Sequence, residues 1–114
     1  MEINRLKLVV YILGSLLIYG ASSAQADFPE FQIEIKNNRF IPEQLKIPAG
    51  TKVRLRVINC DKTPEEFESY DFNREKIILG GKEAKILVGP LPEGEYKFFG
   101  EFNPGTAQGV LIVE

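Results

Sequence analysis

The sequence contains no histidine, and its only cysteine is Cys60. Without histidine, the chain alone cannot build a Ser–His–Asp triad or a metal site that uses imidazole ligands. With one cysteine, it can form neither an internal disulfide bond nor a cysteine-rich zinc site. A free cysteine is usually a small buried side chain, so we expect Cys60 to be buried at a strand end rather than to be a reactive thiol.

The sequence also lacks a strong excess of charge and any run of proline or glycine. The formal net charge is −2 at pH 7, and 44% of the residues are hydrophobic. This balance is typical of one globular domain and gives no reason to expect binding to nucleic acid or to an anionic membrane. No nucleophile–base pair stands out, and a chain without histidine is a poor candidate for a stand-alone enzyme.

Residues 1–26 have the pattern of an export signal. Basic residues precede an apolar stretch at residues 8–19, and small residues then end in the A-x-A cleavage pattern at Ala26. We therefore predict cleavage after Ala26, a mature domain of residues 27–114, and a periplasmic location. The alternative is an uncleaved membrane anchor, but the apolar stretch is shorter than the roughly 20 residues that a spanning helix needs.

The remaining residues alternate between apolar and polar side chains, with the two-residue period of half-buried strands. Such runs recur every 8–12 residues or so between turns, and only residues 63–69 could form a helical turn. The pattern predicts an all-β sandwich or barrel of about seven or eight strands. Large aromatic side chains are mostly buried, so Tyr70 is also assigned to the core. The other side chains that we expect to be buried are Val53, Leu55, Val57, Ile86, Val88, Tyr96, Phe98 and Ile112.

Three segments resemble the cupredoxin, or blue-copper, fold: residues 48–59, residues 91–98 and residues 109–113. The resemblance implies a Greek-key β-sandwich or barrel, but the copper ligands of that family are missing. Gly100 occupies the position of the cysteine, Asn103 that of one histidine, and the pair Glu65-Glu66 follows Pro64 where the other histidine is expected. Type 1 copper is held by one thiolate and two imidazoles, so the residue content excludes a type 1 copper site.

A second resemblance lies within the same superfamily. Glu65-Glu66-Phe67-Glu68-Ser69, Arg74-Glu75-Lys76 and Gly100-Glu101-Phe102 resemble the cupredoxin-like domain of bacterial periplasmic iron-uptake systems of the EfeO and FtrB type. This resemblance implies an accessory protein that handles metal for a ferrous-iron permease. In that family the last string usually continues with histidine, where this chain has Asn103.

Several acidic residues follow the central strand and the penultimate strand, and these two regions meet at one pole of a Greek-key sandwich. Carboxylate oxygens suit Fe³⁺, Mn²⁺ or Ca²⁺ better than Cu⁺, so an iron ion, or a weakly held copper ion, is the expected ligand. Clustered carboxylates should also have raised pKa values when no cation is bound. The candidate metal-binding residues are Glu66, Glu68, Glu75, Glu101 and Asn103.

Two alternatives to a metal site remain open. The acidic residues could pair with Lys62, Arg74 and Lys76 as a solvated, salt-bridged end of the barrel, as most charged runs do. The domain could also be a metal-free module in which this pole docks a partner protein.

Overall fold

The computed structural model describes residues 28–114, and the predicted signal peptide lies outside them. No helix in this described part is long and apolar enough to cross a membrane. The residues form nine strands: β1 (Glu30–Lys36), β2 (Arg39–Ile41), β3 (Gln44–Ile47), β4 (Val53–Asn59), β5 (Glu65–Ser69), β6 (Arg74–Ile78), β7 (Glu83–Val88), β8 (Gly94–Gly100) and β9 (Gln108–Val113).

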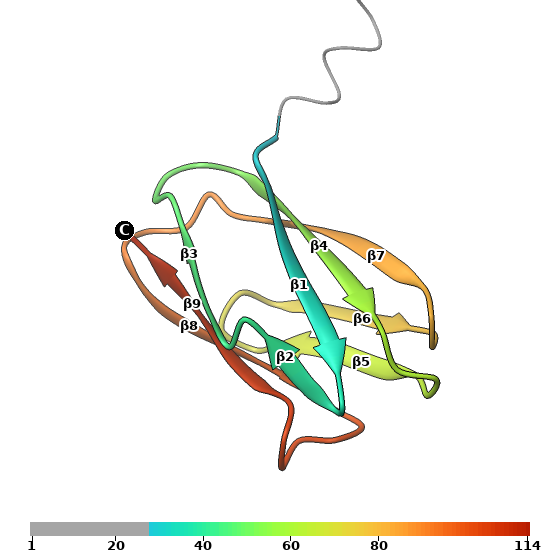
Figure 1. Ribbon diagram of the computed structural model, residues 1–114. Coiled ribbons are helices and arrows are strands. Elements are labelled where there is room, and N and C mark those ends of the chain that lie inside the picture. Colours follow the sequence, from blue (N-terminus) through green and yellow to red (C-terminus); the bar gives the residue numbers. More distant parts are fainter. Residues whose placement is uncertain (1–27) are drawn as a thin grey trace, which may run out of the picture.

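The strands form two sheets that pack face to face (Figure 1). One sheet has the order β2-β1-β4-β7, and the other has the order β3-β9-β8-β5-β6. β1 runs parallel to β4 and β3 runs parallel to β9, whereas the other pairs are antiparallel. The chain therefore crosses between the sheets several times, and the predicted all-β sandwich is confirmed.

The core lies between the sheets and follows the alternation read from the sequence. Val53, Leu55 and Val57 of β4 are fully buried, as expected. Phe98 of β8 lies at the centre of an aromatic group, with its ring centroid 5.0 Å from both the Phe40 and the Phe67 ring centroids. Edge-to-face and stacked contacts of this kind add to the free energy gained by burying the rings.

Two of the expected core residues are only half-buried. Tyr96 packs against the edge of the core, and its hydroxyl donates to the Pro92 carbonyl oxygen at 2.8 Å. Ile112 faces outward because Gly109, Leu111 and Val113 form the inner face of β9. Gly109 lies directly against the Phe98 ring, and this close approach sets which residues of β9 point inward.

Residues 63–69, where the sequence pattern allowed a helical turn, contain strand β5 instead. Glu65, Phe67 and Ser69 point inward, and the residues between them point outward. The same alternation places Tyr70 outside with 76% of its surface exposed, so its assignment to the core is wrong. Cys60 is exposed as well, because the residue before it, Asn59, is the one that turns inward at the end of β4.

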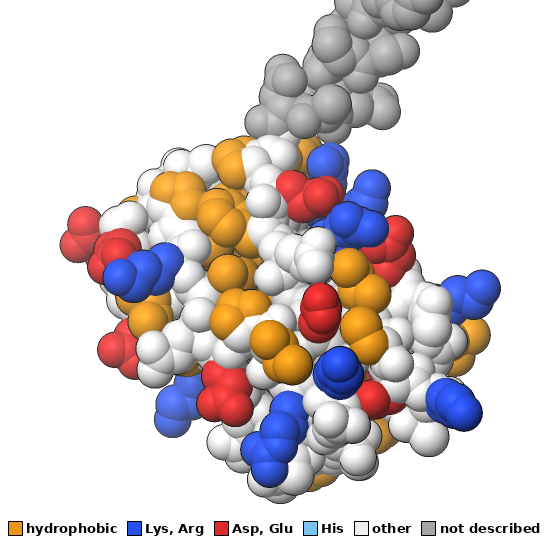
Figure 2. Space-filling model, viewed as in Figure 1, with side chains coloured by type: hydrophobic (Ala, Val, Ile, Leu, Met, Phe, Trp, Pro, Cys, Tyr) orange, Lys and Arg blue, Asp and Glu red, His pale blue; other side chains and the backbone are white. Residues whose placement is uncertain are grey.

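The surface carries charges of both signs. In the view of Figure 2, acidic and basic side chains are interspersed, with no extended patch of one sign on that face. This distribution agrees with the small net charge of the sequence.

Candidate functional site

The residues at the expected copper-ligand positions meet at one pole of the sandwich, where β5 begins and β8 ends. Glu65 is the first residue of β5, and only 2% of its surface is exposed. Its Oε1 accepts hydrogen bonds from the backbone N–H groups of Glu66 at 3.0 Å and Phe102 at 2.9 Å. Its Oε2 accepts a hydrogen bond from Nδ2 of Asn103 at 2.9 Å. The buried carboxylate therefore has a donor on each oxygen.

Phe102 and Asn103 belong to the segment that connects β8 to β9, residues 101–107, which we call the pole loop. The loop is closed at its base, because the Gly100 N–H donates to the Ala107 carbonyl oxygen at 2.8 Å. The Ala107 N–H in turn donates to the Asn103 carbonyl oxygen at 2.9 Å. Thr106 Oγ1 donates to the Asn38 carbonyl oxygen at 2.6 Å, which ties the loop to the turn between β1 and β2.

This pole does not fit a type 1 copper ion. A side chain at position 100 would begin at a Cβ only 2.6 Å from both Cδ and Oε2 of Glu65, and 2.7 Å from the Cβ of Ala107. The carboxylate of Glu65 thus fills the space into which a cysteine at position 100 would project. The surrounding donors are amide groups, which cannot replace a thiolate and two imidazoles.

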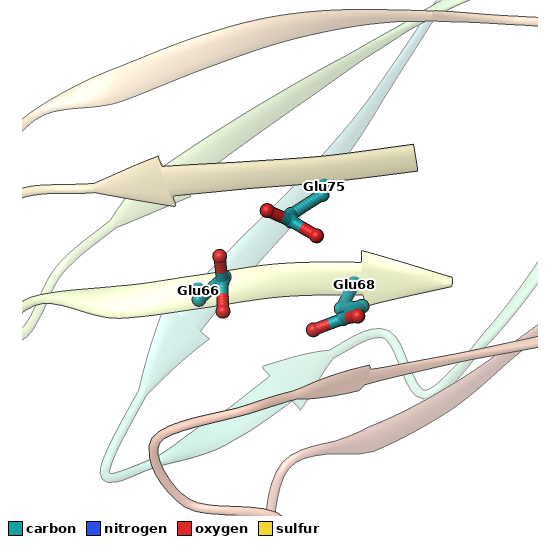
Figure 3. A group of neighbouring side chains, drawn as sticks. All are labelled: Glu66, Glu68 and Glu75. Atoms are coloured by element: carbon teal, nitrogen blue, oxygen red, sulfur yellow. The ribbon is translucent and has the colours of Figure 1, made fainter. Parts of the chain in front are cut away.

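The other candidate residues lie on the outer face of the five-stranded sheet. Glu66 and Glu68 project outward from β5, and Glu75 lies opposite Glu68 on β6. One carboxylate oxygen from each of these three residues lies within 4.8 Å of the other two, and the carboxylates point toward one another (Figure 3). The expectation that they lie near one another holds, but they occupy a sheet face and not the pole, because β5 is a strand. We call Glu66, Glu68 and Glu75 the acidic triplet.

Glu101 borders the triplet, whereas Asn103 faces the pole. The Glu101 N–H donates to the Glu66 carbonyl oxygen at 2.9 Å, so the first residue of the pole loop lies beside β5. The side-chain amide of Asn103 points instead to Glu65, and its Nδ2 donates there. The structure therefore divides the five predicted residues between two places, with Asn103 separated from the rest.

Desolvation and neighbouring carboxylates disfavour the ionisation of Glu66 and Glu68. The pKa of Glu66 is raised, first by desolvation and then by the negative charges of Glu75 and Glu101. The pKa of Glu68 is raised by desolvation and by the charges of Glu101, Glu66 and Glu75. The pKa of the exposed Tyr70 hydroxyl is raised mainly by the charge of Glu68. Because each shift favours the neutral form, a bound cation would relieve the repulsion.

Basic side chains do not neutralise the triplet within residues 28–114. The ion pairs in this part of the chain join Lys46 to Glu114, Arg54 to Glu30 and Arg56 to Glu83. Arg74 instead donates from Nε to the Leu87 carbonyl oxygen at 2.8 Å. The alternative in which Lys62, Arg74 and Lys76 form salt bridges with these acids is therefore not what the described residues show.

Sequence reasoning missed the role of Glu65 and the position of Tyr70. Glu65 was part of a recognised string, but the string did not show which of its acids turns inward. Its position directly after Pro64, where the family has a ligand, was the available signal. Tyr70 lies beside the triplet on the outer face, with its ring centroid 5.4 Å from that of Phe99.

Known proteins match both the sequence and the fold. The family model for the cupredoxin-like domain matches residues 9–113. An uncharacterized protein of Rickettsia prowazekii (strain Madrid E) is 41% identical over 108 residues, which cover 95% of this chain and 84% of that protein.

Two solved structures illustrate the match in fold. Auracyanin A, a blue copper protein of Chloroflexus aurantiacus, superposes with a TM-score of 0.65 at 14% identity, over 75% of this chain and 98% of its own. A purple cupredoxin from Nitrosopumilus maritimus superposes with a TM-score of 0.56 at 27% identity, over 73% of this chain and 98% of its own.

Proposed function

The chain belongs to the family of cupredoxin-like domains, and on this premise we propose that it is a metal-handling accessory protein and not a blue-copper electron carrier. Auracyanin A, a solved structure with this fold, is described as a blue copper protein. In this chain, the pole that would hold type 1 copper is filled by Glu65 and its hydrogen-bond donors. A role in metal handling therefore depends on a different group of ligands.

The observation that carries the proposal is the acidic triplet. Three carboxylates from two neighbouring strands place oxygens within 4.8 Å of one another, and none is paired with a basic side chain in the described part of the chain. Oxygen-only sites favour hard cations such as Fe³⁺, Mn²⁺ or Ca²⁺. Since the site is open to solvent and has no nitrogen or sulfur ligand, we propose weak, exchangeable binding with Glu101 as an additional ligand.

We further propose that the protein serves a ferrous-iron permease system in the bacterial periplasm. The support is the resemblance of the strings around Glu66, Glu75 and Glu101 to iron-uptake accessory domains, together with the export pattern of residues 1–26. Sequencing the N-terminus of the exported protein tests the location, and we expect it to begin at Asp27. A protein that still begins at Met1 would favour the membrane anchor.

Calorimetric titration with Mn²⁺, Fe³⁺ and Cu²⁺ tests the binding site. Glu68 is the ligand chosen for substitution because it neighbours Glu66 on β5 and lies opposite Glu75 on β6. We expect Glu68→Gln to weaken Mn²⁺ binding roughly tenfold or more, because loss of a group that only hydrogen-bonds to a metal ligand already weakens metal binding by that much. Binding should strengthen as the pH rises, because the raised pKa values of Glu66 and Glu68 must be overcome before both carboxylates can act as ligands.

Glu93→Gln is the matched control. It removes the same charge from an exposed turn before β8, so the overall electrostatic attraction for a cation changes equally while the triplet stays intact. Equal losses in the two variants would show that the effect is one of net charge and not of ligation.

The second candidate is a metal-free docking module. Apolar and aromatic side chains near the triplet are exposed to solvent, and they favour this function. The exposed fraction of the surface is 76% for Tyr70, 53% for Ile77 and 60% for Leu79. If the wild-type protein takes up none of the three metals, this second function replaces the first. In both cases we propose that the chain has no catalytic activity of its own.

A further inference from the structure

We propose that Glu65 replaces the metal ion as the group that fastens the pole loop to the rest of the sandwich. Its carboxylate lies at the start of β5, and its two partners from the pole loop lie 37 and 38 residues further along the chain. A single buried acceptor thus connects two distant segments, as a bound ion does when it draws its ligands from both. The carboxylate does so without a metal, so the pole is closed by the chain alone.

The donors around Glu65 are complementary to a carboxylate. Two backbone N–H groups point at Oε1 and an amide nitrogen points at Oε2, so both oxygens act as acceptors. No buried side-chain nitrogen or oxygen in the described residues lacks a hydrogen-bond partner. A glutamine at this position would turn one oxygen into a donor that faces other donors, and a buried donor without an acceptor is costly.

Gly100 supplies the space that Glu65 needs. The backbone of position 100 is part of β8, and any side chain there would collide with Cδ and Oε2 of Glu65. The glutamate and the glycine are therefore interdependent, and together they exclude the cysteine that a copper site would require. The pole is a self-contained hydrogen-bonded closure and not a vacant metal site with one ligand changed.

The donor and the acceptor in the hydrogen bond between Asn103 and Glu65 can be exchanged by substitution. In the double variant Glu65→Gln, Asn103→Asp, the new glutamine nitrogen can donate to the new aspartate, while the glutamine oxygen still accepts from the Glu66 and Phe102 N–H groups. Each single variant is less well matched. Glu65→Gln removes the negative charge and pairs with Asn103 only after the Asn103 amide turns by 180°, and Asn103→Asp sets two carboxylates face to face. A double-mutant cycle isolates this one interaction.

Amide hydrogen exchange of Phe102 in the full mature chain, measured by NMR, reports directly on the closure. In the wild type with a metal chelator present, we expect the Phe102 amide to stay protected. Glu65→Gln should increase its exchange rate roughly tenfold or more, because the pole loop loses its charge-assisted contacts to residue 65 and opens more readily. The double variant should recover most of that protection, while the control Glu95→Gln, an exposed acid on β8, should leave the rate unchanged.

Several results would overturn the proposal. They are an unprotected Phe102 amide in the chelated wild type, an unchanged rate in Glu65→Gln, and a double variant no better protected than Glu65→Gln. If Glu65→Gln fails to fold, recovery of a folded domain by the double variant supports the proposal, and failure of the double variant counts against it. Loss of Phe102 protection on adding the chelator would mean that a metal ion closes the pole.

Discussion

Replacing Gly100 by alanine is the sharpest test of how tightly the pole is packed. The added Cβ would lie 2.6 Å from Cδ and Oε2 of Glu65 and 2.7 Å from the Cβ of Ala107, where ordinary contacts begin at 3.4 Å. Something must move by several tenths of an ångström. The flexible group is the Glu65 side chain, so the methyl group should displace the carboxylate and break its 2.9 Å hydrogen bond with Asn103.

The cost can be worked out from these contacts. A lost hydrogen bond to a charged acceptor costs about 1.5–3 kcal/mol, and forcing an extra methyl group into a packed interior costs about 1–3 kcal/mol. The two together amount to roughly 2.5–6 kcal/mol, a large share of the 5–15 kcal/mol or so that stabilises a typical domain. For a domain of this size, the melting temperature should fall by at least about 10 °C.

Urea denaturation followed by circular dichroism measures the difference, with Gly105→Ala as the matched control in the same loop. A Cβ at position 105 would meet no atom within 4 Å, so that substitution should be neutral or stabilise the fold by up to about 1 kcal/mol. Glu65→Ala should reduce the cost of Gly100→Ala, because it removes one of the two side chains with which the methyl collides. Equal stability of the Gly100→Ala and Gly105→Ala variants would refute this account of the pole.

Three further outcomes are expected. The raised pKa values of Glu66 and Glu68 mean that the metal-free native state binds more protons than the unfolded chain. The contribution of these two residues to the free energy of unfolding should therefore increase as the pH falls from 7 toward 4.5. Urea titrations at several pH values measure this trend, and Glu68→Gln should flatten it. The Cu²⁺-loaded protein should lack the intense visible band of a type 1 copper–thiolate bond; because Cys60 is exposed, Cys60→Ser is the control, and a blue spectrum that persists in it would contradict the ligand argument. Asn103→His should raise Cu²⁺ affinity by supplying an imidazole while lowering stability through loss of the Glu65 contact, and an unchanged affinity in calorimetry would count against it.

The strands with strict alternation could be predicted from the sequence. β4 has apolar side chains at every second position, and the structure buries each of them. β5 could not be predicted in this way, because Glu65 behaves as an inward-facing residue despite its charge. Its burial depends on donors that lie 37 and 38 residues away in the chain, and no local pattern reports such a contact.

The sequence predicted which acidic residues come together better than it predicted where in the fold they lie. The sequence indicated that Glu66, Glu68, Glu75 and Glu101 come together, and their positions on and beside β5 and β6 bring them close. Their assignment to the pole was wrong because it placed all the acids that follow the central strand at the end of the sandwich, whereas residues 65–69 form a strand that runs along the sheet. On a strand, Glu65 and Glu66 point to opposite faces, so one residue enters the pole and the next faces solvent.

The pairing of β3 with β9 governs when the domain can fold. β3 pairs in parallel with β9 and lies at the edge of its sheet, so within the described residues β9 is its only strand partner. β9 follows the other eight strands in the chain, and the five-stranded sheet is therefore incomplete until this segment has been synthesised. Contacts between such distant segments slow folding, because the long loop must close before the pairing stabilises it. The pairing of β3 with β9 thus makes completion of the five-stranded sheet wait for β9, whereas the sheet β2-β1-β4-β7 contains no strand beyond β7.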